Sequence, residues 1–495
     1  MKKKLLIIGL DGVPWRILDK MIEENVTPNL KKLKEKGAYG ELETTIPPLT
    51  PAAWSSIQTG VNPGKHGVFS FQGPRKGGGP PAPVNSKDIQ TTTFPEFLDN
   101  AGLRAVLVNL PLSHPPKTDF PTVGSIFSNE IAKPESLLKE YDFSYYELSA
   151  PDMTETNVKK NLKNIHSNVK SNFPVVKKLY QNEDWDLFFY MFSQTDWTLH
   201  QAGEEFFFDE DEKKVKLVKR IYKAIDEKIG WFIDQMDKKT NLLIMSDHGF
   251  KNYEKQLSPA NRLEKENLIK VQPKSLSWES ENSLRDNLLS NTFRLALHSK
   301  TISSYLEFRY PWFCNNNMTQ IKEESKVLAG DPKFPAFFIN DERFFGTVKD
   351  KHKVKKKLDE VLNTYSDKIE VHKKDDIYWG DQLERGPEYI AMPKKYLPKM
   401  FLINREITTG EFQHSMDGIV IGYGPDVKHT ELEGSTVFDI TPTILHYFDI
   451  PLPEYLDGNV LMGMLEEASD LYREPEISEK KEEKKIKDKI KEIDL

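Results

Sequence analysis

Continuous apolar runs alternate with helical patterns along this chain. The runs occupy residues 5–10, 105–110, 187–192, 241–245 and 418–422, and each has the length of a strand buried on both faces. Between them, apolar residues recur at helical spacing in segments 27–36, 215–236 and 436–448. This alternation predicts an α/β fold in which helices cover both faces of a mostly parallel central sheet.

Polar residues follow several of these runs at their carboxyl ends. Asp11 comes after the first run, Asp196 after the third, and Asp247 and His248 after the fourth. Ligands of open α/β sheets bind beyond the carboxyl ends of the strands. We therefore expect these sequence-distant side chains to meet at one edge of the sheet.

Three other segments break the alternating rhythm. Residues 251–345, rich in polar and aromatic side chains, are predicted to form a cap inserted into a catalytic domain made of residues 1–250 and 346–465. Residues 73–83 are rich in glycine and proline and are expected to be a surface loop. Residues 466–495 form a charged tail that ends in a helical pattern of isoleucines, through which two copies could pair as a homo-oligomer.

Composition narrows the possible functions. The 76 acidic and 69 basic residues are interleaved and leave a net charge of -7, which disfavours nucleic acid as a partner. Cys314 is the only cysteine, so a metal site would use Asp, Glu and His. The apolar run at the start is too short for a signal peptide, and no stretch approaches the roughly 20 apolar residues of a membrane span. The sequence thus predicts a cytoplasmic protein.

Thr50 and Pro51 together indicate the start of a helix. We expect Thr50 to be the N-cap and Pro51 the first helical residue. A hydroxyl in this position faces the positive end of the helix dipole, where a phosphate group can be held. An ordinary cap without any chemistry is the alternative interpretation of this pair.

Three further motifs carry possible metal ligands. Asp196 and His200 are four residues apart, so on a helix they share one face and can reach one ion. Asp247 and His248 precede Gly249, where a tight turn is expected. His414 is predicted to lie in a polar loop ahead of the last apolar run. Taken singly, the pair at 196 and 200 could be a helix cap and His414 could be solvated.

These four segments, in this order, resemble the alkaline phosphatase superfamily, in particular its type I phosphodiesterase and nucleotide pyrophosphatase branch. Residues 59–67 and 439–445 extend the resemblance, which covers about residues 4–464. It implies an alkaline-phosphatase-like fold with two divalent metal ions, zinc or else manganese or iron. One ion would be held by Asp196, His200 and His414, and the other by Asp11, Asp247, His248 and the oxygen of Thr50.

The implied activity is phosphoryl transfer to Thr50 followed by hydrolysis. The substrate would be a small phosphodiester or pyrophosphate, such as a nucleotide or nucleotide sugar. Phe71, however, stands where well-known nucleotide pyrophosphatases carry an asparagine, and residues 63–69 are similar to a prokaryotic group of predicted phosphohydrolases and phosphomutases. A phosphomonoesterase, a phosphomutase, a phosphonate hydrolase and an inactive nucleotide- or glycan-binding member therefore stay open. A monoesterase would need an added cation, for which Lys65, Arg75 and Arg343 are candidates.

Overall fold

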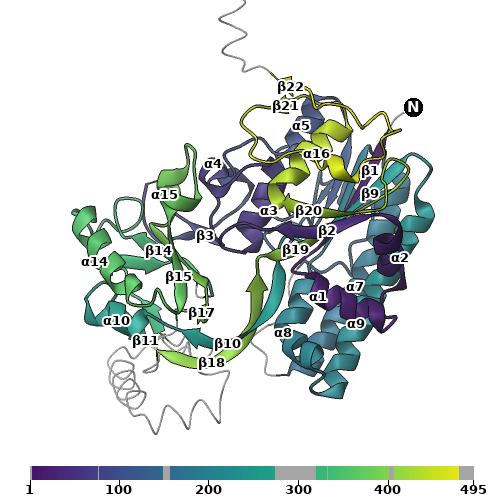
Figure 1. Cartoon of the computed structure of the whole chain (residues 1–495). Helices are drawn as coiled ribbons and strands as arrows, with labels where there is room; N and C mark the ends of the chain where they lie inside the picture. Colours follow the sequence, from purple (N-terminus) through teal and green to yellow (C-terminus); the bar gives the residue numbers. More distant parts are fainter. Residues whose placement is uncertain are drawn as a thin grey trace, which may run out of the picture.

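The chain folds into two lobes of unequal size (Figure 1). A computed structural model describes residues 3–75, 77–148, 157–273, 319–331, 333–400 and 406–478. The larger lobe is built on a nine-stranded sheet, in the order β20-β2-β19-β9-β1-β8-β5-β6-β7. These strands are β1 Lys4–Leu10, β2 Ala38–Glu43, β5 Ala105–Val108, β6 Thr122–Val123, β7 Ala132–Lys133, β8 Leu187–Phe192, β9 Thr240–Met245, β19 Asp417–Tyr423 and β20 Thr430–Thr436.

The centre of this sheet is parallel, as the apolar runs predict. Strand β1 pairs in parallel with both β8 and β9, and β8 pairs in parallel with β5. The last apolar run, which became β19, lies antiparallel to both of its neighbours, β9 and β2. The mostly parallel α/β architecture expected from the sequence is therefore confirmed, with one antiparallel strand inside the sheet.

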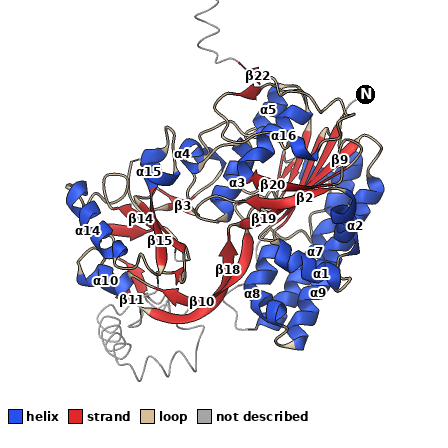
Figure 2. Cartoon of the chain, in the orientation of Figure 1, coloured by secondary structure: helices blue, strands red, loops and turns tan. Residues whose placement is uncertain are grey.

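Helices cover both faces of the sheet (Figure 2). On one face, α1 Trp15–Glu23, α2 Pro28–Lys36, α7 Val158–Asn182 and α9 Glu212–Gln235 pack over Leu6 and Ile8 of β1. On the other face, α3 Thr50–Thr59, α5 Phe94–Asn100 and α16 Ile440–Tyr447 pack over Leu5 and Ile7. Successive side chains of a strand point to opposite faces, so a continuous apolar strand supplies two cores.

The smaller lobe contains a second sheet, which is entirely antiparallel. Its strands lie in the order β13-β14-β16-β15. They are β13 Val327–Ala329, β14 Ala336–Ile339, β15 Ile369–Lys373 and β16 Tyr389–Pro393, and α14 Lys351–Asn363 packs against them. Two of these strands follow residue 345, the end expected for the cap. We therefore propose that the inserted unit continues to the beginning of β18.

A long strand pair joins the two lobes. Strands β10 Gly249–Leu257 and β18 Ile407–Ser415 run antiparallel to each other, away from the large sheet and toward the smaller lobe (Figure 1). The chain leaves the large lobe along β10 and returns along β18, which leads into β19. The smaller lobe is thus an insertion between two neighbouring strands of the large sheet.

Some sequence expectations fall outside the described residues, among them those on Cys314 and on the isoleucine pattern of the tail. Self-pairing through that tail stays a prediction. None of the described helices combines the length and apolar character that crossing a bilayer requires.

Candidate active site

The structure brings the seven predicted site residues together. Two groups form, and the possible ligand atoms within each group lie within 4.8 Å of one another. The first cluster is Asp196, His200 and His414, and the second cluster is Asp11, Asp247 and His248. The clusters adjoin, because the rings of His248 and His414 stack with centroids 3.8 Å apart.

Strand order explains this convergence. Asp11 follows β1, and Asp247 follows β9, the parallel neighbour of β1, so both carboxylates lie at the same sheet edge. Strand β8, on the other side of β1, leads into α8 Gln194–Phe208. This helix carries Asp196 and His200 on one face, as their spacing predicts, with Asp196 Oδ1 and His200 Nε2 3.4 Å apart.

His414 reaches the site through strand pairing. It lies within β18, where its register partner is Phe250, two residues after His248. The predicted polar loop is wrong at this position, since His414 lies in a strand, and its burial excludes the alternative of a solvated side chain. Its Nε2 lies 3.2 Å from Asp196 Oδ1 and 2.9 Å from His200 Nε2. The pairing of β18 with β10 thus places His414, the third member of the first cluster.

Two glycines allow the close packing of the site. Gly249 is not a turn residue, contrary to expectation; it begins β10, and a β-carbon there would lie 2.2 Å from the carbonyl oxygen of Asp417. Gly12 has a φ of 69°, and a β-carbon there would lie 3.1 Å from His248 Cε1 and 3.2 Å from Asp196 Oδ1. A side chain at Gly12 would therefore fill the space where the clusters meet.

Thr50 is the first residue of α3 and not its cap. Leu49 is the N-cap, has an extended backbone, and provides no side-chain hydrogen bond to the helix. The predicted capping role of Thr50 is therefore wrong. Its hydroxyl Oγ1 instead lies 3.4 Å from Nε2 of His248, in the second cluster. The hydroxyl is thus available at the N-terminal end of a helix and beside the two clusters.

Backbone carbonyls orient two of the histidines. Nδ1 of His414 lies 2.9 Å from the carbonyl oxygen of Pro48, and Nδ1 of His248 lies 3.2 Å from that of Gly249. A carbonyl only accepts, so in each ring Nδ1 carries the proton and donates it. The lone pair of each Nε2 then faces the cluster, which is the arrangement that a metal-ligating histidine needs.

The electrostatics of both clusters call for a cation. Burial raises the pKa of Asp11 well above its usual value, and the charges of Asp247 and Asp196 raise it further. Burial also lowers the pKa of His200 and His414 well below normal, so these rings are neutral and cannot balance the carboxylates. Three buried carboxylate oxygens accept no hydrogen bond among the described residues: Asp11 Oδ1, Asp196 Oδ1 and Asp247 Oδ2. Carboxylates and neutral imidazoles left in this state fit divalent metal ions.

Two residues at the site were not found from the sequence. Arg16 on α1 donates to the carbonyl oxygen of Phe250 and pairs with Asp417, which ties together the beginnings of β10 and β19. Lys333, from the loop between β13 and β14, places Nζ 3.3 Å from His200 Nε2. Neither residue stands in a motif, and the contacts that reveal them join segments far apart in the sequence.

The cations considered from the sequence have other roles. Lys65 pairs with Asp457, Arg343 pairs with Asp341 and Glu388, and Arg75 is exposed. Lys333 is therefore the cation that the structure offers to the first cluster.

His66 braces α3 from the side of the core. Its Nε2 lies 2.9 Å from Ser56 Oγ, and its Nδ1 accepts from the Val68 amide at 3.2 Å. Since Nδ1 accepts, Nε2 carries the proton and donates it to the Ser56 hydroxyl. Burial lowers the pKa of His66 from 6.5 to about 3, although the charge of Asp457 opposes this shift.

The lowered pKa of His66 predicts that the folded protein loses stability in acid. Below about pH 6.5 the unfolded chain takes up a proton on His66 while the folded chain does not, so the stabilisation is complete above that pH and declines as pH falls toward 3. Between pH 7 and pH 5, His66→Gln should lose about 2 kcal/mol less of unfolding free energy than the wild type. Urea unfolding at both pH values measures the difference. Equal losses would contradict this assignment.

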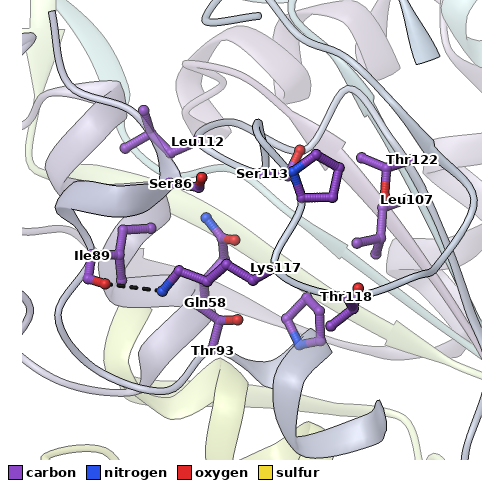
Figure 3. A pocket seen from close by; sticks show the side chains of 12 residues that line it. Gln58, Ser86, Ile89, Thr93, Leu107, Leu112, Ser113, Lys117, Thr118 and Thr122 are labelled. Carbon is purple, nitrogen blue, oxygen red and sulfur yellow. Dashed lines mark hydrogen bonds between the residues drawn. The ribbon is translucent and has the colours of Figure 1, made fainter. Parts of the chain in front are cut away.

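A separate narrow hollow, with a cavity volume of about 20 Å³, lies beside Gln58, near the C-terminal end of α3 (Figure 3). Its lining includes Gln58, Thr93 and Lys117, and the Lys117 ammonium donates to the carbonyl oxygen of Ile89 at 2.9 Å. None of the residues that line it belongs to either cluster. We therefore place the chemistry at the clusters and not in this hollow.

Comparison with known proteins agrees with this geometry. The model of the family described as type I phosphodiesterase / nucleotide pyrophosphatase matches residues 5–398. The chain belongs to this family. Membership places the protein among metal-dependent phosphoryl-transfer hydrolases. No curated protein sequence matches the chain significantly.

Solved structures with the same fold include other phosphodiesterase-type proteins. Murine ectonucleotide pyrophosphatase / phosphodiesterase 5 is 14% identical, with a TM-score of 0.52, over 90% of this chain and 95% of that one. An inactive variant of it in complex with AMP is 15% identical, with a TM-score of 0.53, over 94% and 100%. Phosphonoacetate hydrolase from Sinorhizobium meliloti 1021 in complex with phosphonoformate is 13% identical, with a TM-score of 0.51, over 89% and 94%. At these identities the matches establish the alkaline-phosphatase-like fold.

Proposed function

We propose that this family member is a metal-dependent phosphodiesterase or nucleotide pyrophosphatase that works through a phosphothreonine at Thr50. The observation that carries the proposal is the position of the Thr50 hydroxyl. It caps no helix, stands at the N-terminal end of α3, and lies 3.4 Å from Nε2 of His248. A nucleophile at this place faces two buried clusters built from three carboxylates and three imidazoles.

The clusters provide two metal sites in this proposal. Asp196, His200 and His414 would hold one ion, and Asp11, Asp247, His248 and Thr50 the other. The three buried carboxylate oxygens that accept no hydrogen bond from the described residues support this assignment. When bound, such ions polarise phosphoryl oxygens and lower the pKa of a coordinated hydroxyl. Mixed oxygen and nitrogen donors suit zinc, and also manganese or iron.

The chain's own groups then account for the two chemical steps. The Thr50 hydroxyl loses its proton to solvent and its oxygen attacks phosphorus; a bond forms between them, and the bond from phosphorus to the leaving oxygen breaks on the opposite side, so that the leaving oxygen departs and takes up a proton from water. The positive end of the α3 dipole stabilises negative charge on the transferred phosphoryl group, which keeps its remaining ester group. Water then attacks phosphorus and releases the Thr50 hydroxyl together with a phosphomonoester product. His248, held by the carbonyl of Gly249, keeps its Nε2 toward the hydroxyl throughout.

A small phosphate ester is the proposed substrate, since AMP and phosphonoformate are bound by the proteins of similar fold. A phosphonate hydrolase is the second candidate, favoured by the match to phosphonoacetate hydrolase. Phe71 also separates this chain from the well-known nucleotide pyrophosphatases, because its ring stacks on Phe127, with centroids 5.9 Å apart, and can donate no hydrogen bond to a phosphate. The cytoplasmic location stays a prediction from the sequence.

A substrate panel tests the proposed function. Protein loaded with zinc, manganese or iron would be offered a bis-aryl phosphodiester, an aryl phosphomonoester, a nucleotide pyrophosphate and phosphonoacetate, with bound metal measured in each sample. We expect two metal ions per chain. We also expect a higher kcat/KM for the diester than for the monoester, because a diester carries a single negative charge at phosphorus, whereas the doubly charged monoester needs an added cation. Faster phosphonate cleavage would favour the second candidate. Binding of nucleotides without any turnover would identify an inactive member.

A further inference from the structure

One cation reaches the first cluster from the smaller lobe. Lys333 lies in the loop between β13 and β14, and its Nζ is 3.3 Å from Nε2 of His200. Within the described part of the chain, no carboxylate lies within ion-pair distance of this ammonium. The Lys333 ammonium thus faces the first cluster without a contacting carboxylate among the described residues, and its N–H groups can donate to an anionic ligand.

The loop that presents Lys333 is anchored on both sides. The Asp331 carboxylate accepts hydrogen bonds from the amides of Lys333 and Phe334, at 2.7 and 3.2 Å. Phe334 is fully buried and packs near the ring of His414, with centroids 6.2 Å apart. The backbone of Lys333 is thus held against the first cluster by a turn and by a buried aromatic side chain.

Lys333 stands on one particular side of the reacting centre. Its Nζ lies 3.3 Å from Nε2 of His200, in the first cluster. Thr50 lies beside His248, in the second cluster. Lys333 and the nucleophile therefore belong to different ends of the site.

The geometry of an in-line displacement indicates which part of the substrate lies near Lys333. Attacking and leaving oxygens are roughly in line on opposite sides of phosphorus, so attack from Thr50 directs the leaving group toward the first cluster. We propose that Lys333 is a specificity-determining residue that binds an anionic group on the leaving side of the substrate, which makes a pyrophosphate diester a better substrate than a diester whose leaving group carries no phosphate. This inference rests on the proposed function.

Two substrates that transfer the same adenylyl group test it. The p-nitrophenyl ester of AMP releases p-nitrophenolate, whereas diadenosine pyrophosphate releases AMP, which carries the additional phosphate charge. Lys333→Met should lower kcat/KM for the pyrophosphate by roughly 10- to 100-fold, the value of a hydrogen bond to a charged group, and change that of the aryl ester by less than about threefold. Lys333→Arg should restore much of the loss. Calorimetric titration of AMP into metal-loaded Thr50→Ala protein, with and without Lys333→Met, provides a readout that does not depend on turnover.

Lys399→Met is the matched control, since this nearby lysine already pairs with Glu411; it should leave the ratio of the two activities unchanged. Equal effects of Lys333→Met on both substrates, unchanged AMP binding, or loss of bound metal would overturn the role of Lys333. If the wild type hydrolyses the aryl ester, but Lys333→Met does not change the ratio of kcat/KM between the two substrates, only this inference fails. If the metal-loaded wild type hydrolyses neither substrate, the proposed function fails and the inference fails with it.

Discussion

Thr50→Ala is expected to lower kcat/KM for the preferred substrate by at least about a hundredfold, because it removes the nucleophile and with it covalent catalysis. The residue forms no cap that the helix would lose. Folding should therefore be little affected, and circular dichroism and bound metal should match the wild type. Steady-state kinetics on metal-loaded protein measures the effect, which should appear mainly in kcat.

Thr50→Ser is the matched variant, since it retains the hydroxyl and removes one methyl group. It should keep a substantial part of the activity. In the wild type, acid quenching during turnover of an adenylyl substrate followed by peptide mass spectrometry should find an adenylyl group on the peptide that contains Thr50, and none on that of Thr50→Ala. Comparable turnover by Thr50→Ala, or an adenylyl group on another residue, would contradict the proposed mechanism.

Asp247→Asn is expected to have the second large effect: it should raise the stability of the metal-free protein and lower both metal binding and activity. Without metal, the variant should have a higher melting temperature than the wild type, because burial and then the charges of Asp247 and Asp196 raise the pKa of Asp11, and the substitution removes one of these two charges. With metal, it should bind about one ion fewer and lose at least about a hundredfold in kcat/KM, since metal stabilisation of the developing charge contributes several kcal/mol. Differential scanning fluorimetry, metal analysis and kinetics measure the three outcomes.

Asp226→Asn distinguishes a metal ligand from an ordinary buried carboxylate. Asp226 is also buried, but it accepts hydrogen bonds from the amides of Asn29 and Leu30 at the beginning of α2. Its replacement should lower the melting temperature with or without metal and leave the metal content intact. If Asp247→Asn behaves in the same way, the second cluster does not hold an ion.

The sequence predicts the strands well, because they depend on local signals, and it selects side chains that the structure brings together in the two clusters. A continuous apolar run indicates a buried strand, and a polar residue directly after it lies at the sheet edge, as Asp11 and Asp247 do. The helical spacing of Asp196 and His200 predicts that they share one face, and the family resemblance implies their role as metal ligands. The fold class and the family follow from the same segments.

The features that the sequence misses depend on contacts between distant segments. The environment of His414 follows from its pairing with Phe250 across the strand ladder, and the strand itself carries no local sign of that partner. Thr50 loses its predicted capping role because the helix begins one residue earlier than the threonine and proline pattern indicates. Lys333 is one of many lysines in the chain, and only the path of the smaller lobe shows that it lies beside His200.

The insertion of the smaller lobe through β10 and β18 limits how this protein can be shortened or recombined. The same strand pair that leads out to the lobe holds His414 opposite Phe250. Excising the lobe, or exchanging it for that of a relative, would have to preserve this register at the base of the pair. A splice that shifts it by one residue would turn His414 to the other face of the ladder and dismantle the first cluster, even if the large lobe still folded.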